Sequence, residues 1–337
     1  MKTRLPLSRE QFHTTPTLLL ENDAFSVELF RYPAGIEAVR LRNRRGSVVI
    51  LPFYGQMIWD AEFDGQQMTM GNRFRQPLPG SNIIDTYGCF AFHSGLLANG
   101  CPSAEDAHPL HGEMACARMD SAWIVLEEGC LALEGESEYI KGFGHHYLAA
   151  PAVRLQADAA RMHIDMQVTN LAGAPMPLQY MCHLNYAWVE GGRFRQSIPD
   201  DAFRLRTSIP AHVQPTPRWR AFTEQLANDP QALRQLDQPE MYDPEIVFFA
   251  DHLPQYGDEL QFELHAPTGH AFMTRFSSAQ FPHATRWILY NQDQQVAAFV
   301  LPATCRPEGF NAAQQAGTLI TLASGEQRSF SVETGLL

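Results

Sequence analysis

The segment Val153-Arg-Leu-Gln-Ala-Asp-Ala-Ala-Arg-Met-His-Ile-Asp-Met-Gln-Val-Thr169 contains the pattern that decides the fold. In its second half, apolar side chains at positions 162, 164, 166 and 168 alternate with polar ones at 161, 163, 165 and 167. Successive side chains of a strand point to opposite faces of a sheet, so this alternation predicts a strand with one buried face. Residues 158–160 separate it from the run at 153–157, and the two runs are expected to pair as an antiparallel hairpin.

The same pattern recurs along the chain. Asp64-Gly65 predicts a hairpin turn between residues 58–63 and 66–70, and residues 127–129 predict another between 123–126 and 130–136. Further strands are expected at 176–183, 318–322 and 328–332. Many short strands without a linker predict an all-β fold, a large antiparallel β-sandwich that forms a single domain over residues 1–337. The first 25 residues or so are expected to form an N-terminal extension.

Helical patterns are rare in this sequence. Thr216-Pro217 provides a cap and a proline at the first helical position for residues 218–228. Asp229-Pro230 repeats this signal before residues 231–236. We therefore expect a short helical insertion at about 216–238.

Composition excludes several classes of function. The 337 residues carry a formal net charge of -12, which argues against binding to nucleic acid or to anionic membranes. No apolar run approaches the roughly 20 residues of a membrane span, and the N-terminus lacks the apolar region of a signal peptide. The six cysteines form no CxxC pair and are expected to be reduced thiols of a cytoplasmic protein.

Residues 93–113 form the stretch richest in potential catalytic and ligand groups. They contain three histidines, two glutamates and one aspartate, together with glycines and prolines that predict a loop. A second candidate is His183, at the end of an apolar strand and next to aromatic residues. Histidine is the most common general acid or base because its pKa lies near neutrality.

Several ordered segments resemble the aldose 1-epimerase (galactose mutarotase-like) superfamily. They are Leu110-His111-Gly112, the stretch from Val168-Thr-Asn170 to Cys182-His183-Leu-Asn-Tyr186, the segment from Trp287 through Leu301-Pro302 to Glu308-Gly309, and the closing stretch 316–326, which is similar to a final hairpin of that family. The similarity spans about residues 45–337 and is closest to a divergent, uncharacterised branch. It implies a super β-sandwich with a sugar-binding cleft.

The resemblance also implies site residues. His183 corresponds to the general acid that protonates the ring oxygen of the sugar, and His111 assists on that side. The family carries its catalytic glutamate immediately before the proline of the third segment, where this chain has Leu301. The carboxylates considered as replacements are Asp106, Glu113 and Glu308, and His93, Asp106 and Glu113 are expected to bind the substrate.

Three functions are consistent with these features. The first is a cofactor-free isomerase of the aldose 1-epimerase type, acting on a small sugar as a monomer or homodimer. The second is a metal-dependent sugar isomerase or epimerase, with a divalent Zn, Mn or Fe ion held by the His93–Glu113 loop. Its ligands would come from His93, Asp106, His108, His111 and Glu113. The third is a carbohydrate-binding or sensing protein that lost catalysis together with the glutamate.

Overall fold

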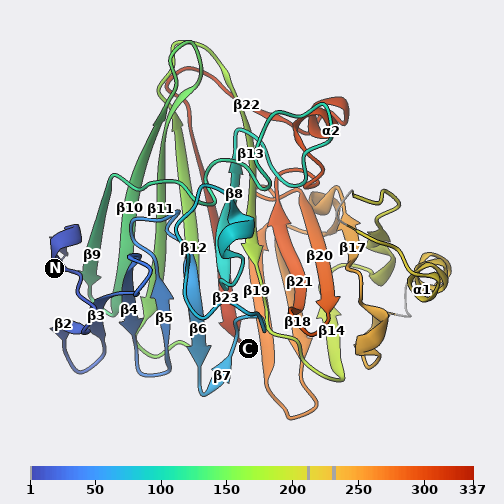
Figure 1. The fold of residues 1–337 in the computed structure, drawn as a ribbon, viewed down its shortest axis with the longest axis horizontal. Helices are drawn as coiled ribbons and strands as arrows, with labels where there is room; N and C mark the ends of the chain where they lie inside the picture. The colour runs from blue at the N-terminus through green and yellow to red at the C-terminus, as the bar shows by residue number, and fades with distance from the viewer. Residues whose placement is uncertain (1, 211–212, 230–232) are drawn as a thin grey trace.

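Antiparallel strands form two large sheets that pack face to face (Figure 1). The computed structural model describes residues 2–210, 213–229 and 233–337. In these ranges, the first sheet contains ten strands, in the spatial order β1 (Thr3–Pro6), β9 (Ser121–Glu127), β10 (Cys130–Ile140), β11 (His146–Gln156), β12 (Arg161–Asn170), β23 (Gln327–Leu336), β19 (Ala271–Ser277), β18 (Glu259–His265), β14 (Gly192–Gln196) and β16 (Gln235–Leu236).

The second sheet contains thirteen strands of the described chain. Its spatial order is β15 (Phe203–Leu205), β17 (Ile246–Ala250), β20 (His283–Tyr290), β21 (Gln295–Ala303), β13 (Met176–Leu184), β8 (Ala91–Leu96), β6 (Ile58–Phe63), β5 (Gly46–Ile50), β4 (Glu37–Arg42), β3 (Ser26–Arg31) and β2 (Thr17–Glu21). Two short strands lie off this path, since β22 (Ile320–Leu322) pairs with β13 and β7 (Gln66–Gln67) pairs with β6. The predicted all-β sandwich is confirmed.

Strand β12 shows why the sequence pattern identified the fold. Met162, Ile164, Met166 and Val168 are all buried, and the residues between them are half-buried or exposed. The hairpins β6–β7, β9–β10 and β11–β12 form where they were predicted. Alternating burial on strands of both sheets thus generates the core between them.

Both ends of the chain differ from the sequence-based prediction. The first 25 residues are part of the sandwich, because β1 pairs with β9 of the first sheet and β2 pairs with β3 of the second. The closing segments do not pair as a hairpin: β22 pairs with β13, whereas β23 runs between β12 and β19. The turn signal at residues 323–326 does not determine which sheet each flanking strand joins.

The helical insertion is confirmed in its first half. Helix α1 (Pro217–Asn228) begins after Thr216, whose hydroxyl accepts a hydrogen bond from the Trp219 amide, and Pro217 occupies its first turn. Residues 230–232, at the start of the second predicted helix, lie outside the described residues. The end of that predicted helix is wrong, because residues 235–236 form β16, which pairs with β14. A second helix, α2 (Phe310–Gln315), was not predicted. Further 3-10 turns lie in the described part of the chain, among them η1 (Arg9–Gln11), η2 (Ile83–Thr86), η3 (Asp200–Ala202), η5 (Pro239–Met241) and η6 (Leu253–Tyr256).

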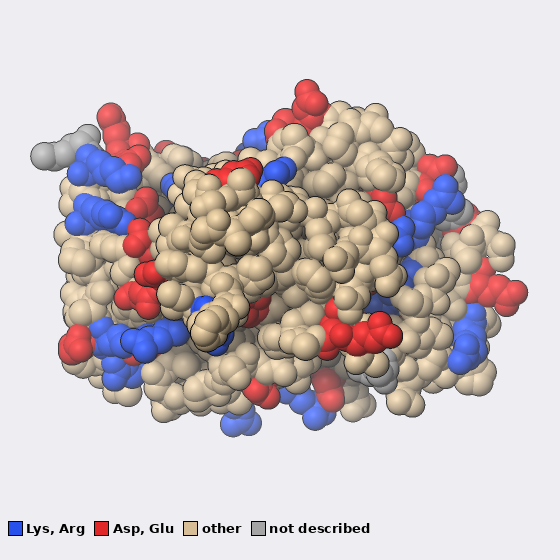
Figure 2. All heavy atoms as spheres, turned by 90° about the horizontal axis from the view of Figure 1, so that it is seen from above, with Lys and Arg blue, Asp and Glu red and all other residues tan. Residues whose placement is uncertain are grey.

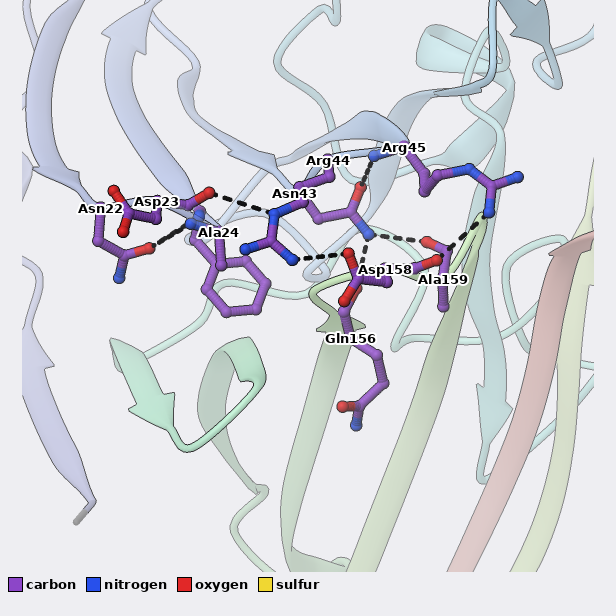
Figure 3. Close-up of polar contacts among 10 residues, drawn as sticks. Asn22, Asp23, Ala24, Asn43, Arg44, Arg45, Gln156, Asp158 and Ala159 are labelled. Atoms are coloured by element: carbon purple, nitrogen blue, oxygen red, sulfur yellow. Dashed lines mark hydrogen bonds and ion pairs between the residues drawn. The ribbon is translucent and has the colours of Figure 1, made fainter.

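Three turns at one end of the sandwich join the two sheets through side-chain hydrogen bonds (Figure 3). The Asn43 amide, in the β4–β5 turn, donates to the carbonyl oxygens of Gln156 and Ala159 in the β11–β12 turn, each at 2.7 Å. Arg44 pairs with Asp158 at 2.7 Å and donates to the carbonyl of Asp23 in the β2–β3 turn. These contacts hold the turn of one sheet against turns of the other.

Charged side chains of both signs are interspersed along the edges of the face shown in Figure 2, around a central area without charged groups. The net charge of -12 is therefore not gathered into one acidic patch on that face. Among the helices in the described ranges, none has both the length and the apolar character needed to cross a membrane.

Candidate functional site

A cavity of about 440 Å³ opens on the second sheet, on the face that points away from the first sheet. Strand β13 shows this geometry: Met181 and His183 line the cavity, whereas Tyr180, the residue before Met181, points the other way and contacts Phe330 of β23 across the core. Strands β13, β17, β20 and β21 form the floor, and loops form the rim. The aromatic lining residues are Phe74, Tyr87, Phe249 and Trp287, and the polar ones include His111, His183, Arg206, Asp243, Glu245 and Thr285.

The structure brings His111 and His183 together in the wall of this cavity. Their ring centroids are 4.8 Å apart and the rings are perpendicular, with an interplanar angle of 87°. His183 stacks on Phe92 of β8, the residue directly opposite it in the β8–β13 ladder, at 4.5 Å and 16°. The sheet register therefore fixes the position of the His183 ring.

His111 reaches the same place because its loop folds back onto β8. The His111 amide donates to the Gly100 carbonyl at 2.9 Å, and its carbonyl accepts from the Gly95 amide at 2.9 Å. His111 and Gly112 both adopt left-handed backbone conformations, with φ of 62° and 77°. A Cβ at Gly112 would lie 2.2 Å from the Ala98 carbonyl oxygen, so the turn requires glycine here. Ser94 Oγ lies 3.0 Å from His111 Nδ1.

Burial controls the charge of His183. His183 is 3% exposed, and this burial lowers its pKa well below the ordinary value of histidine. The charge of His111 lowers the pKa of His183 further, and a hydrogen bond to the Asn185 side chain opposes the decrease. His183 is therefore a neutral imidazole at pH 7. Its Nε2 atom lies 3.2 Å from the Tyr87 hydroxyl, and burial raises the pKa of that phenol well above its ordinary value, so Tyr87 is also neutral.

A carboxylate that the sequence analysis did not identify, Glu245, stands at the entry of β17. It accepts a hydrogen bond from Arg206 at 2.8 Å and one from the Trp287 indole at 2.6 Å. The Arg206 and Glu245 side chains are only 11% and 14% exposed. The ion pair thus fixes both the carboxylate and the aromatic wall of the cavity.

Leu301 lies in the same cavity, on β21 opposite Thr285 of β20. None of the three carboxylates considered from the sequence lines this cavity. Glu308 accepts from Ser208 at 3.0 Å beside a different, smaller cavity, and Asp106 and Glu113 line a third one. Glu245 and Asp243 are the acidic residues in the lining of the Leu301 cavity, as far as the described residues extend.

His93 does not join the other two histidines, which corrects the expectation that it binds the substrate. Alternation along β8 directs Phe92 and Ser94 toward His183 and His111, whereas His93 packs in the core. Its Nδ1 atom lies 2.9 Å from the Tyr180 hydroxyl, and burial lowers the pKa of His93 to about 4. A side chain enclosed between the sheets cannot reach a ligand on the outer face.

Asp106 and Glu113 accept hydrogen bonds from backbone amides and hydroxyl groups around them. Asp106 accepts hydrogen bonds from Ser103 and from the amide of Asn311 at the start of α2. Glu113 accepts from the Leu96 and Leu97 amides and from the Tyr147 hydroxyl. Both line a separate cavity of about 370 Å³, so the structure does not bring them together with His111 and His183.

The five residues of the alternative metal site are therefore distributed over three places. His93 lies in the core, His111 lines the first cavity, and Asp106, His108 and Glu113 line the other. Within residues 2–210, 213–229 and 233–337, no group of three or more His, Cys, Asp or Glu side chains is arranged to hold a metal ion. The loop does not supply the predicted ligand set.

Sequence reasoning missed Tyr87, Arg206 and Glu245. The first two stand in segments without periodicity, which gave no signal. Glu245 had a usable one, since Asp243-Pro-Glu245 precedes the apolar run Ile246-Val-Phe-Phe-Ala250, and an acidic residue at the entry of a buried strand is unusual.

Comparisons with known proteins agree with this architecture. A candidate aldose 1-epimerase from Klebsiella pneumoniae subsp. pneumoniae superposes with a TM-score of 0.82 at 14% identity, covering 100% of this chain and 92% of that one. A galactose mutarotase-like protein from Clostridium acetobutylicum gives 0.61 at 12% identity, with 94% and 99% covered. A candidate aldose 1-epimerase from Escherichia coli K12 gives 0.55 at 15% identity, with 100% and 99% covered.

The sequence comparisons are less specific. Residues 208–336 match the family model described as a domain of unknown function, DUF4432. No curated protein matches the chain in sequence. The chain thus has the galactose mutarotase-like fold that its sequence segments suggested. Its sequence identity to the three structures named above is only 12–15%.

Proposed function

We propose that the chain is a cytosolic carbohydrate isomerase of the aldose 1-epimerase type, which opens and recloses a sugar ring in the cavity that contains His111 and His183. The observation that carries this proposal is the convergence of these two histidines, 4.8 Å apart, on an aromatic-lined cavity of about 440 Å³. Cavities of roughly 300–1,000 Å³ with a few placed polar groups are typical of small-molecule sites. The Trp287 and Tyr87 rings suit the apolar faces of a sugar.

The electrostatics support proton donation by His111 rather than by His183, which exchanges the roles that the sequence resemblance implied. Two imidazoles in contact hold one proton between them more readily than two, because like charges repel at short range. The fully buried His183 is the less favourable place for that charge. We therefore assign the proton for the ring oxygen to His111.

Glu245 is the carboxylate that we assign in place of the family glutamate at Leu301. It lines the cavity, and the Arg206 and Trp287 bonds hold it in one orientation. Glu245 takes the proton of the anomeric hydroxyl, the bond between C1 and the ring oxygen breaks, and the ring oxygen takes a proton from His111. After rotation about C1–C2, the open aldehyde recloses and both protons return.

Exchange NMR on a panel of aldoses and ketoses tests this function, since interconversion of the anomers at equilibrium is measured directly. His111→Ala and Glu245→Gln are expected to lower the rate by about 100-fold or more, the usual contribution of a general acid or base. His108→Ala and Glu240→Gln are matched controls, because neither side chain lines the cavity. Chelator treatment is expected to leave the rate unchanged, since side chains carry both transfers. If no sugar of the panel is interconverted, the proposal fails.

A non-catalytic carbohydrate-binding protein is the second candidate, and Leu301 is the observation that favours it. Its side chain is 1% exposed and places an apolar group in the cavity wall where the related enzymes have their base. Leu301→Glu distinguishes the two functions. In a protein that lost catalysis with this residue, the substitution is expected to create interconversion from an inactive background, whereas in an enzyme that uses Glu245 the wild type is already active.

A further inference from the structure

Asn185, His183 and Tyr87 form a line of polar groups that ends at the cavity. The His183 ring cannot turn, because Phe92 stacks on one side at 4.5 Å and the edges of His111 and Trp287 close the others at 4.8 and 5.8 Å. The direction of each ring nitrogen is thus fixed. Which nitrogen carries the proton then decides what the Tyr87 hydroxyl can offer to a ligand.

The inner nitrogen, Nδ1, faces Asn185. Among the described residues, His183 Nδ1 and Asn185 Oδ1 are both buried, and neither atom has a hydrogen-bond partner. The Asn185 side chain nevertheless acts on the His183 ring as a hydrogen-bonding group that raises its pKa. The Asn185 amide nitrogen donates to the Cys89 carbonyl at 3.0 Å, which identifies the other side-chain atom as the oxygen. We infer that Nδ1 carries the proton, because a small adjustment then lets its N–H donate to that oxygen and satisfies both atoms. The opposite tautomer leaves two buried acceptors facing each other.

The outer nitrogen, Nε2, is then a lone-pair acceptor. Tyr87, whose hydroxyl lies 3.2 Å away, must donate its single proton to it. Tyr87 lines the cavity and has no further hydrogen-bond partner among the described residues. Its oxygen therefore presents lone pairs, and no proton, to the interior of the cavity.

We propose that Tyr87 is a specificity-determining residue whose oxygen accepts a hydrogen bond from one hydroxyl group of the substrate, and that His183 and Asn185 position it by fixing the direction of its proton. This inference rests on the proposed function for the identity of the ligand as a sugar. It adds a requirement for a free hydroxyl at one position of that sugar, where a deoxy or O-methyl group leaves the buried Tyr87 oxygen unpaired. His183 and Asn185 act through Tyr87 and are positioning residues.

The tautomer of His183 can be measured without any substrate. In 15N NMR spectra of the labelled full chain at neutral pH, His183 is expected to show a protonated Nδ1 and an unprotonated Nε2, with the signals assigned by their loss in His183→Gln. Asn185→Asp keeps an oxygen acceptor and is expected to keep this tautomer, whereas Asn185→Leu is expected to reverse it. A protonated Nε2 in the wild type overturns the inference, whatever the activity of the protein.

The substrate requirement is tested with monodeoxy analogues of a sugar that the wild type interconverts. One analogue is expected to lose about 5- to 100-fold in kcat/KM, the cost of an unpaired buried acceptor. Tyr87→Phe removes that acceptor and is expected to process this analogue and the parent sugar at similar rates, while discrimination at the other positions is kept. Unchanged discrimination by Tyr87→Phe overturns the proposed contact. Failure of the proposed function is recognised separately, because it leaves no interconverted sugar while the tautomer measurement still stands.

Discussion

The buried imidazole of His93 makes a sharp prediction about stability and pH. His93 is 2% exposed, and burial lowers its pKa from 6.5 to about 4 because the core disfavours the charged form. The unfolded chain therefore binds a proton at a pH where the folded chain does not. By linkage, the free energy of unfolding falls as the pH falls from about 6.5 toward 4.

The magnitude follows from these two pKa values. Between pH 7 and pH 5, the proton bound only by the unfolded chain lowers the free energy of unfolding by about 2 kcal/mol. His93→Gln keeps a polar group beside the Tyr180 hydroxyl but cannot be charged in this range. We expect the variant to lose about 2 kcal/mol less than the wild type over the same interval, whatever the substitution itself costs at pH 7.

Urea unfolding at pH 7 and pH 5 measures this difference directly. His13→Gln is the control, because it makes the same substitution at an exposed histidine outside the core. The neutral His183 is present in all three proteins and cancels from the comparison. If His93→Gln and the wild type lose the same stability between pH 7 and pH 5, the reasoning about the core histidine is wrong.

Three further substitutions test contacts elsewhere. Asn43→Ala removes the two 2.7 Å bonds between the turns of the sheets and is expected to lower the free energy of unfolding by about 1–3 kcal/mol in urea titrations, with activity unchanged. Trp287→Phe keeps an aromatic wall but loses the 2.6 Å hydrogen bond to Glu245. Because hydrogen bonds to charged groups contribute about 1.5–3 kcal/mol, kcat is expected to fall about tenfold or more. An unchanged kcat would show that the indole does not orient the carboxylate. Gly112→Ala is expected to displace His111 and lower kcat/KM more than tenfold, whereas the control Gly129→Ala, in a hairpin turn with no neighbouring atom within 4 Å, keeps the wild-type rate.

The sandwich could be predicted from sequence because its information is local. The alternation of β12 and the turn at 158–160 specify a hairpin within a window of about twenty residues. Strand partners that are distant in sequence carry no such signal. Alternation describes β1 and β2 as strands at best, and only packing decides that one joins each sheet.

The two site histidines were found for a different reason. Each lies in a short segment that resembles a family motif, and the His111 turn also has a local requirement, the left-handed Gly112. His93 was an equally good candidate in the same stretch. Successive residues of β8 point to opposite faces of the sheet, so the His93 side chain points into the core while its neighbours Phe92 and Ser94 point to the outer face.

Glu245 escaped sequence analysis because a site on the face of a sheet is not tied to one strand. The cavity floor draws side chains from β13, β17, β20 and β21, and each strand offers every second residue to it. A carboxylate can therefore change strands while it still reaches the same bound molecule, as long as its new neighbours orient it. Arg206 and Trp287 both donate hydrogen bonds to Glu245 and help to orient its carboxylate. In the proposed mechanism Leu301 then has a positive role: it leaves an apolar floor beside the charged pair, and a water-poor floor strengthens the electrostatic interactions on which the proposed proton transfer depends.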